Sequence, residues 1–422
     1  MADHAIPSGY ALFAGRLNLM PQGAPPGDLL FSILKILMSE EEARLLSLAP
    51  AKPFTAEKMA RIWKMDEPSA RRILDELAGR ALLLDSDGTY LLPPPMAGFF
   101  EFSMMRYRND IDQEALGRLF YRYLNVEENF VRELFTEGET QLGRVFVNEP
   151  VLTERNAFQV LDYERASHVI QTATHIGVGA CYCRRKMKIM GRECGAPIDI
   201  CMTFNNSAAS LTKHGHARAV SVAECMGLLE KAYDHGLVQF GDNVRNGVNF
   251  ICNCCGCCCE GMIAARRFGM LNPVRTTAFI PVVDEAKCNG CGKCVDACPV
   301  GAMTLVSAND PRKPKLRKAL LDRDACLGCG VCVRACARGA LELESREERI
   351  VTPANSVHRV VLMAIERGKL QNLIFDNRAL LSHRAMAAIM GAVLRLPPVK
   401  RAMAGEQMKS RYLVKLIERM NI

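Results

Sequence analysis

The chain has 422 residues, 24% of them charged, a formal net charge of +8 and 19 cysteines. This length suits roughly two to four domains, and the sequence has neither a basic-then-apolar leader nor an apolar run of about 18 residues, so we expect neither export nor a membrane-spanning helix. Every cysteine lies between residues 181 and 336, mostly in C-x-C and C-x-x-C groups. Metal ligation in a reducing cytoplasm therefore explains them better than a disulfide framework.

After an N-terminal extension (1–26), residues 27–95 have the pattern of three helices and a hairpin. Ser39 and Glu42 form a capping box, and Thr55 and Ser69 mark the starts of two further helices. Two short apolar runs on either side of an Asp-Ser-Asp-Gly turn then predict strand, turn and strand. This order resembles a winged helix-turn-helix fold, so we predict a winged-helix-like domain over 27–95.

The charge of this region argues against DNA binding. Residues 55–92 hold six Lys or Arg and seven Asp or Glu, a net charge of −1. DNA binding by such a module requires cationic side chains that neutralise phosphates. We therefore expect a protein-contact or structural role here, followed by a helical connector over 96–147 whose apolar residues recur at helical spacing.

A cysteine-rich domain is predicted over 148–275, where six cysteines fall within eight residues. Free thiols packed so closely would oxidise readily, so a further iron–sulfur cluster or metal site is the economical explanation. We expect Cys181 and Cys183 to face part of this run, with Cys194 and Cys201 completing the site. Alternate residues of a strand point to opposite faces, so the run could also serve a second site. The candidate ligands are Cys181, Cys183, Cys194, Cys201, Cys252, Cys254, Cys255, Cys257, Cys258 and Cys259.

Other polar groups of this domain receive plainer interpretations. The basic residues from Arg184 to Lys186 would compensate thiolate charge or attract an acidic partner. Cys225 lies on a predicted amphipathic helix and is expected to be a buried thiol. His214 and His216 have no partner at ligand spacing and are expected on a surface loop.

Residues 276–348 contain a duplicated cysteine module. Residues 280–305 align with 318–343 at an offset of 38, and each half reads C-x2-C-x2-C-x3-C. Three cysteines at this spacing place three thiolates on one wrapped loop. We expect the fourth cysteine to begin a helix and to ligate the other cluster. Two zinc sites are the alternative, although zinc sites usually pair two C-x2-C knuckles.

The module resembles the bacterial two-cluster ferredoxin family. The resemblance implies two [4Fe-4S] clusters with crossed ligands, the first held by Cys288, Cys291, Cys294 and Cys336, the second by Cys326, Cys329, Cys332 and Cys298. Pro299 fits the family pattern, whereas Ala337 departs from it in the second half. The stretch from Cys181 through Phe204, with the cysteine run, resembles multi-domain iron–sulfur proteins of anaerobic bacteria that join such a domain to a two-cluster ferredoxin. The Cys-Cys-Gly string also resembles heterodisulfide reductase subunits, but its spacing differs and their catalysis is not carried over.

The tail, 349–422, predicts helices over 355–370 and 379–422. Its last part, 408–420, is basic and amphipathic. Such a helix suits docking on a redox partner protein, contact with an anionic membrane surface, or packing on its own chain.

These elements predict an α+β multidomain protein with a winged-helix-like N-terminal domain, a cysteine-rich middle domain, a two-cluster ferredoxin-like domain and a helical tail. The preferred function is a cytoplasmic electron-transfer protein or subunit that relays single electrons from a donor to a partner oxidoreductase. One alternative is a reductase with a substrate-binding cluster in the cysteine-rich domain, although no G-x-G-x-x-G dinucleotide motif is present. Another is an iron–sulfur redox sensor that regulates transcription through the winged helix.

Overall fold

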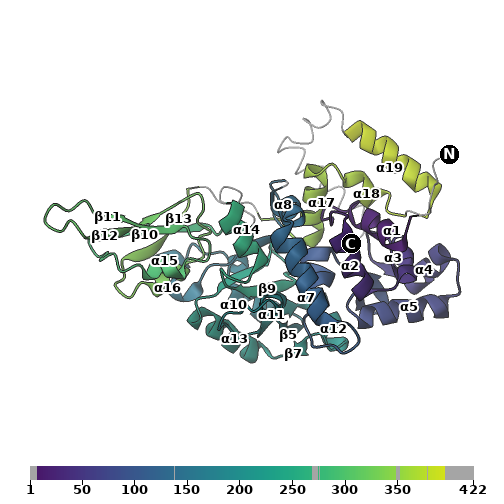
Figure 1. The fold of residues 1–422 in the computed structure, drawn as a ribbon, viewed down its shortest axis with the longest axis horizontal. Coiled ribbons are helices and arrows are strands. Elements are labelled where there is room, and N and C mark those ends of the chain that lie inside the picture. The colour runs from purple at the N-terminus through teal and green to yellow at the C-terminus, as the bar shows by residue number, and fades with distance from the viewer. Residues whose placement is uncertain are drawn as a thin grey trace.

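The structure is a computed structural model, and it describes residues 7–136, 138–268, 274, 276–347, 352–377 and 379–394. It mixes helices with several small sheets. Figure 1 shows a long molecule with helices of both chain ends on one side, a sheet-containing middle part, and a narrow part built on β10 to β13 at the opposite end. Within the described ranges, every helix is too short or too polar to cross a bilayer.

The N-terminal part consists of short capped helices and a small sheet. Ser39 and Glu42 form the expected capping box, Thr55 caps the fourth helix, and Asp66 rather than Ser69 caps the fifth. The strands pair in the order β1-β3-β2. The elements are α1 (Gly9–Leu17), α2 (Asp28–Leu37), α3 (Glu40–Leu46), β1 (Phe54–Thr55), α4 (Ala56–Trp63), α5 (Glu67–Gly79), β2 (Leu84–Ser86) and β3 (Thr89–Leu91).

The segment after residue 95 packs into the same hydrophobic core as these helices. Phe100 contacts the rings of Phe99, Phe120 and Phe130, and all four are buried in one cluster with α1 to α5. The boundary predicted at residue 95 therefore runs through a shared core, while the winged-helix interpretation stays a prediction. The elements are η1 (Pro95–Phe99), α6 (Phe100–Phe102), α7 (Gln113–Tyr121), η2 (Arg122–Val126) and α8 (Asn129–Thr136).

The middle part is built on a six-stranded antiparallel sheet with the order β4-β8-β9-β6-β5-β7. Its strands are β4 (Gly143–Val145), β5 (Ile176–Ala180), β6 (Asp199–Phe204), β7 (Arg218–Ala219), β8 (Val238–Asp242) and β9 (Phe250–Cys254). Its helices are η3 (Glu149–Val151), α9 (Glu154–Ala157), η4 (Asp162–Glu164), α10 (Ala166–Thr172), α11 (Tyr182–Ile189), α12 (Asn205–Lys213), α13 (Val222–Asp234) and α14 (Glu260–Phe268). The sheet positions the cysteines because β9 carries the start of the cysteine run and α11 begins directly after Cys181.

The two histidines expected on a surface loop instead pack against the N-terminal part. His216 is only 1% exposed, and its Nε2 lies 3.0 Å from the Gly79 carbonyl oxygen. His214 Nε2 lies 2.8 Å from Asp85 Oδ1 on β2. The surface-loop expectation was wrong because sequence spacing does not show which distant element covers a turn.

The duplicated module folds as two copies of strand, cysteine loop, helix and strand. The equivalent elements keep the predicted offset of 38 residues along the whole repeat, and the strands of the two copies pair with each other. Gly292 and Gly330 precede the two helices at a φ of 82° each, a left-handed conformation that favours glycine. The elements are β10 (Phe279–Val283), α15 (Lys293–Ala297), β11 (Met303–Ser307), β12 (Arg317–Leu321), α16 (Val331–Ala335) and β13 (Leu341–Ser345).

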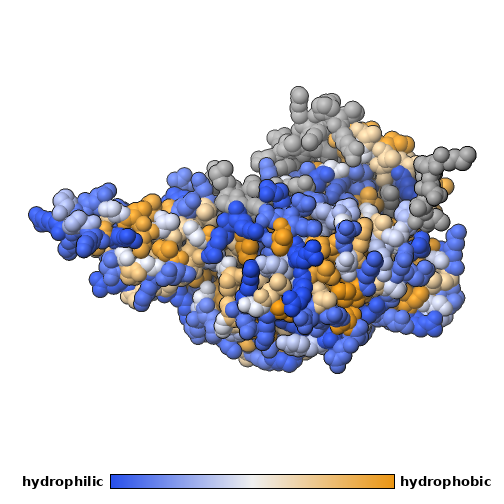
Figure 2. Space-filling model, in the orientation of Figure 1, coloured by the Kyte–Doolittle hydropathy of each residue, from blue (hydrophilic) through white to orange (hydrophobic). Residues whose placement is uncertain are grey.

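The tail returns to the N-terminal end as α17 (Ser356–Glu366), α18 (Leu370–Ile374) and α19 (Leu381–Leu394). The predicted basic helix over 408–420 lies outside the described residues. Figure 2 shows apolar side chains on α19, where Leu381 is 74% exposed, and a hydrophilic tip on the module at the opposite end. Arg312, Lys313 and Lys315 are exposed in the loop between β11 and β12 at that tip.

Candidate metal centres

Two groups of four cysteines surround separate small cavities in the duplicated module. One cavity, of about 20 Å³, is lined by Cys288, Cys291, Cys294 and Cys336. The other, of about 10 Å³, is lined by Cys298, Cys326, Cys329 and Cys332. Each group thus takes three cysteines from one half of the repeat and the fourth from the other half.

Backbone N–H groups surround these thiols in a nearly symmetric way. Ala302 N–H donates to Cys298 Sγ over 3.2 Å, and the equivalent Ala340 N–H donates to Cys336 Sγ over 3.4 Å. Gly328 N–H donates to Cys326 Sγ over 3.4 Å. A side chain at residue 328 would not fit, since its Cβ would lie 2.1 Å from the Phe279 carbonyl oxygen. Such donors stabilise thiolates and are among the groups that set cluster potentials.

Burial disfavours ionisation of the thiols in the module. It raises the pKa of Cys329 to about 12 and also raises the pKa values of Cys294, Cys326 and Cys332. Metals bind thiolates and not thiols. The free energy of metal binding would therefore have to offset the cost of ionising these buried thiols. The module is therefore an environment in which thiols without a metal are poorly ionised.

The ten candidate cysteines of the middle part separate into two groups. Six of them contact one another in a closed ring, which we call the six-thiol ring: Cys181, Cys183, Cys259, Cys254, Cys252 and Cys201, in that order. The remaining four form a second set, which we call the four-thiol group: Cys194, Cys255, Cys257 and Cys258. Cys181 and Cys183 thus face part of the run, and Cys201 lies with them, whereas Cys194 lies in the other group.

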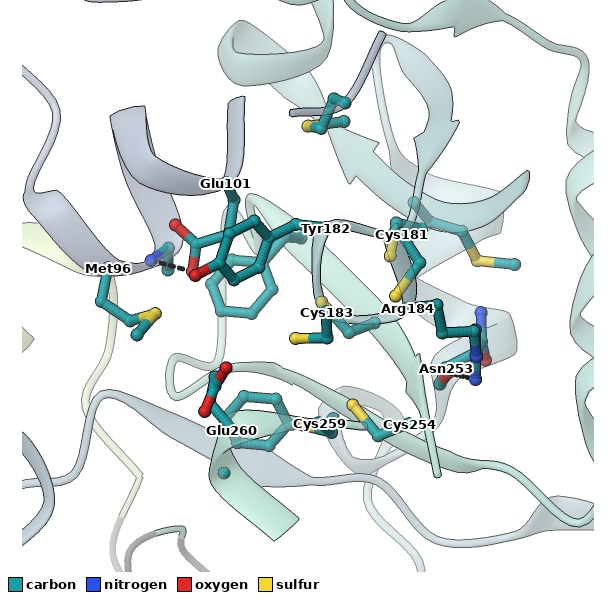
Figure 3. Close-up of a pocket in the computed structure, with 18 of the residues that line it drawn as sticks. Met96, Glu101, Cys181, Tyr182, Cys183, Arg184, Asn253, Cys254, Cys259 and Glu260 are labelled. Atoms are coloured by element: carbon teal, nitrogen blue, oxygen red, sulfur yellow. Dashed lines mark hydrogen bonds between the residues drawn. The ribbon is translucent and has the colours of Figure 1, made fainter. Parts of the chain in front are cut away.

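Three structural elements position the six-thiol ring. Cys181 is the N-cap of α11 and Cys183 lies in its first turn. Cys252 and Cys254 are two residues apart on β9 and therefore point to the same face. Strand pairing of Met202 with Ile251 brings the neighbouring Cys201 and Cys252 together. Figure 3 shows Cys181 and Cys183 across the cavity from Cys254 and Cys259.

Protonation alternates around the six-thiol ring. Hydrogen bonds from their two ring neighbours lower the pKa values of Cys181, Cys252 and Cys259, that of Cys252 to about 6. The same hydrogen bonds, together with burial, raise the pKa values of the donors Cys183, Cys201 and Cys254. Ionisation of Cys181, Cys252 and Cys259 is therefore favoured over ionisation of the three thiols between them.

The six-thiol ring lines a cavity of about 110 Å³, which Cys255 and Cys258 also line, and buried cations lie beside it. Arg184 donates from Nη1 to the Pro197 oxygen over 2.8 Å and from Nη2 to the Asn253 oxygen over 2.7 Å. The thiolates nearby, Cys181 first, raise the pKa of this guanidinium despite its burial. Lys186, fully buried, donates to Glu260, the residue after Cys259. The pKa of Lys186 is lowered to about 8, chiefly by burial.

Glu101 lines the same cavity and was not expected from the sequence (Figure 3). It belongs to α6, in the segment interpreted as a connector, and accepts N–H bonds from Ala97 at 2.8 Å and Gly98 at 3.1 Å. Burial raises the pKa of Glu101 to about 8. A single glutamate in an aromatic helix carries no motif, so only the fold could bring it to the cysteines.

The four-thiol group is much tighter than the ring. All four Sγ atoms lie within 4.8 Å of one another, and the pairs Cys194–Cys255, Cys194–Cys258 and Cys257–Cys258 are each 3.7 Å apart. A hydrogen bond from Cys258 is the main cause that lowers the pKa of Cys255 to about 5. Cys225 lies outside both sets: it is buried on α13, as expected, and burial raises its pKa to about 12.

Residues 287–340 match the family model of the 4Fe-4S dicluster domain. Searches of curated proteins and of solved structures give no match. The matched segment covers all eight cysteines that line the two cavities of the duplicated module. The chain therefore contains a 4Fe-4S domain, and with it the capacity for iron–sulfur electron transfer.

Proposed function

We propose that the protein relays single electrons between a donor and a partner oxidoreductase, through two [4Fe-4S] clusters in the duplicated module and a further cluster in the six-thiol ring. The observation that carries this proposal is the ring itself, six thiols around a cavity next to a 4Fe-4S domain. Iron–sulfur clusters transfer one electron at a time and are held by cysteine thiolates.

The duplicated module supplies the first part of this proposal. Its two cysteine groups would each hold one cluster, with Cys336 and Cys298 exchanged between the halves of the repeat. Because each half contributes a ligand to the other site, the relative position of the two clusters would be fixed by the same chain segments that bind them. A short fixed separation favours electron transfer between them.

The number of thiols in the ring favours a relay over a catalytic iron with an open position. A four-iron cubane takes four cysteine ligands, and the ring offers six, so no iron needs another ligand. The charge of Arg184 would offset the thiolates at the buried site, whereas the charge of Lys186 is paired with Glu260. The protein's own residues would thus bind the cluster and exclude water from it. The cluster would supply the redox chemistry.

Packing connects the ring to the module. Cys254 and Cys259 of the ring belong to the same buried cluster as Cys294, Cys298, Cys326 and Cys332 of the module, together with Val300 and Met303. A continuous packed interior supports an electron path between the sites because it leaves no layer of solvent to cross.

The test is an iron and sulfide analysis of the anaerobically purified chain. Two cubanes contain about eight of each element, so a third four-iron cluster in the ring would raise the count to about twelve. The double variant Cys181→Ser/Cys259→Ser should lose about four of each and one signal in a redox titration. Cys225→Ser, which removes a buried thiol outside the sites, is the matched control. A wild-type count of about eight would refute the third cluster and with it the extended relay.

A reductase is the second candidate, and Glu101 is the observation that favours it. A carboxyl group beside the six-thiol ring could supply protons to a substrate reduced in the cavity. In that case small exogenous ligands such as cyanide should perturb the spectrum of the ring cluster. An unperturbed spectrum would leave the relay as the function of this site.

A further inference from the structure

The four-thiol group has the dimensions of a site for one metal ion. With metal–sulfur bonds of about 2.3 Å, four sulfur atoms at the corners of a tetrahedron lie roughly 3.8 Å apart. Three pairs in the four-thiol group are 3.7 Å apart, and no pair exceeds 4.8 Å. A single ion at the centre would therefore reach all four sulfur atoms with little rearrangement.

The other cysteine groups of the chain provide an internal comparison. Among the described residues, no three thiols of the six-thiol ring or of the duplicated module lie within 4.8 Å of one another. Those groups surround cavities, as a cluster with several irons and sulfides requires. The sulfur atoms of the four-thiol group lie too close together to surround such a cluster, although Cys255 and Cys258 also line the cavity beside the ring.

We propose that Cys194, Cys255, Cys257 and Cys258 bind one Zn²⁺ ion in a closed tetrahedral site. Four cysteines with no open position are typical of structural zinc sites. Thiolates bind divalent zinc more tightly than ferrous iron, which favours zinc where no sulfide bridges can form. The charge of Arg184, which lies near both Cys181 and Cys255, would partly offset the net negative charge of the zinc tetrathiolate.

The contacts of the loop indicate what the ion would do. Cys255, Cys257 and Cys258 surround Gly256, which packs directly on Pro299, the residue after Cys298 of the module. The same loop joins Cys254 to Cys259, both of which belong to the six-thiol ring. An ion at the four-thiol group would therefore hold the loop that supports the ring on one side and the module on the other.

The experiment is a zinc determination on the full chain purified anaerobically. We expect about one zinc per chain in addition to the iron. The variant Cys257→Ser should lose most of the zinc and keep the iron and sulfide of the duplicated module. Cys257 is the exposed member of the group, so its replacement disturbs the buried packing least. Cys225→Ser should keep both metals.

A second measurement does not depend on a variant that folds. Zinc should be replaceable by Co²⁺, and the cobalt protein should show the absorption bands of a tetrahedral tetrathiolate. Absence of zinc from the wild type, a mononuclear iron in its place, or full retention of zinc in Cys257→Ser would overturn the proposal. None of these results depends on whether the six-thiol ring holds a cluster, so this site and the relay can fail separately.

Discussion

Neighbouring residues of the cysteine run face different sites. Cys252, Cys254 and Cys259 belong to the six-thiol ring, whereas Cys255, Cys257 and Cys258 belong to the four-thiol group. The strand accounts for the first two, since residues two apart on β9 share a face. The turn after Cys254 then redirects the chain, so the three thiols of the loop point elsewhere and Cys259 returns to the ring.

At the scale of the residue, Gly256→Ala tests the contact between this turn and the module. An added Cβ would lie 2.5 Å from the Pro299 oxygen, well below an ordinary contact. We expect the module to be displaced and the free energy of unfolding to fall by about 1–3 kcal/mol, the usual cost of overpacking. Denaturant unfolding under anaerobic conditions measures this fall in the free energy of unfolding.

The matched control is Gly227→Ala on α13, where an added Cβ meets nothing within 4 Å. Alanine is the better helix former, so this variant should be as stable as the wild type or slightly more stable. Equal stability of Gly256→Ala and Gly227→Ala would show that the turn does not support the module.

At the scale of elements, the hairpin of β2 and β3 is joined to α12 by a buried polar contact. Asp85 on β2 accepts from Ser210 Oγ over 2.9 Å and also binds Lys213 and His214. Burial alone would raise the pKa of Asp85, but these hydrogen bonds outweigh it and lower the pKa. Because this contact occupies part of the hairpin, it also argues against a sensor that would insert the hairpin into DNA.

The same interface predicts acid sensitivity. Burial is the main cause that lowers the pKa of His216 to about 4, from about 6.5 in an unfolded chain. The unfolded state therefore binds more protons between these values, and stability falls as the pH drops from about 6.5 to about 4, by on the order of 2–3 kcal/mol. Asp85 has a lowered pKa, so its contribution is lost only at lower pH, near and below about 4.

Denaturant unfolding at several pH values would measure this loss. His216→Gln keeps a donor for the Gly79 oxygen and should flatten the pH dependence between about 6.5 and 4 relative to the wild type. His235→Gln, on the exposed end of α13, is the control and should follow the wild type. Cysteine thiolates also take up protons in acid and contribute to the pH dependence of both variants. The effect of His216 is therefore the difference in pH dependence between His216→Gln and His235→Gln.

At the scale of the whole molecule, the sequence predicted what depends on repetition and spacing. The offset of 38 residues predicted two equivalent copies in the duplicated module, since equal segments fold alike. The prediction that the fourth cysteines begin helices was wrong, because Cys298 and Cys336 follow the last residues of α15 and α16. The sequence could not assign the ten cysteines of the middle part to the six-thiol ring and the four-thiol group. The separation of Cys194 from Cys201 depends on where β6 begins and on the turn after Cys254. The sequence analysis also missed Glu101 and misplaced His214 and His216, whose partners Asp85 and Gly79 lie 129 and 137 residues away along the chain.

The interleaving of two ligand sets along one short run has a consequence for how the protein matures. A chain emerging without metal offers six adjacent thiols, and a cluster built on the wrong three would block both sites. If zinc enters first, it occupies Cys255, Cys257 and Cys258 and leaves only the correct three for iron and sulfide. We therefore expect anaerobic reconstitution of the apoprotein to yield more ring cluster when zinc precedes iron than when iron precedes zinc. Iron analysis and absorption spectra would measure the yield of ring cluster. Equal yields would show that the two ligand sets are selected without help from the order of metal loading.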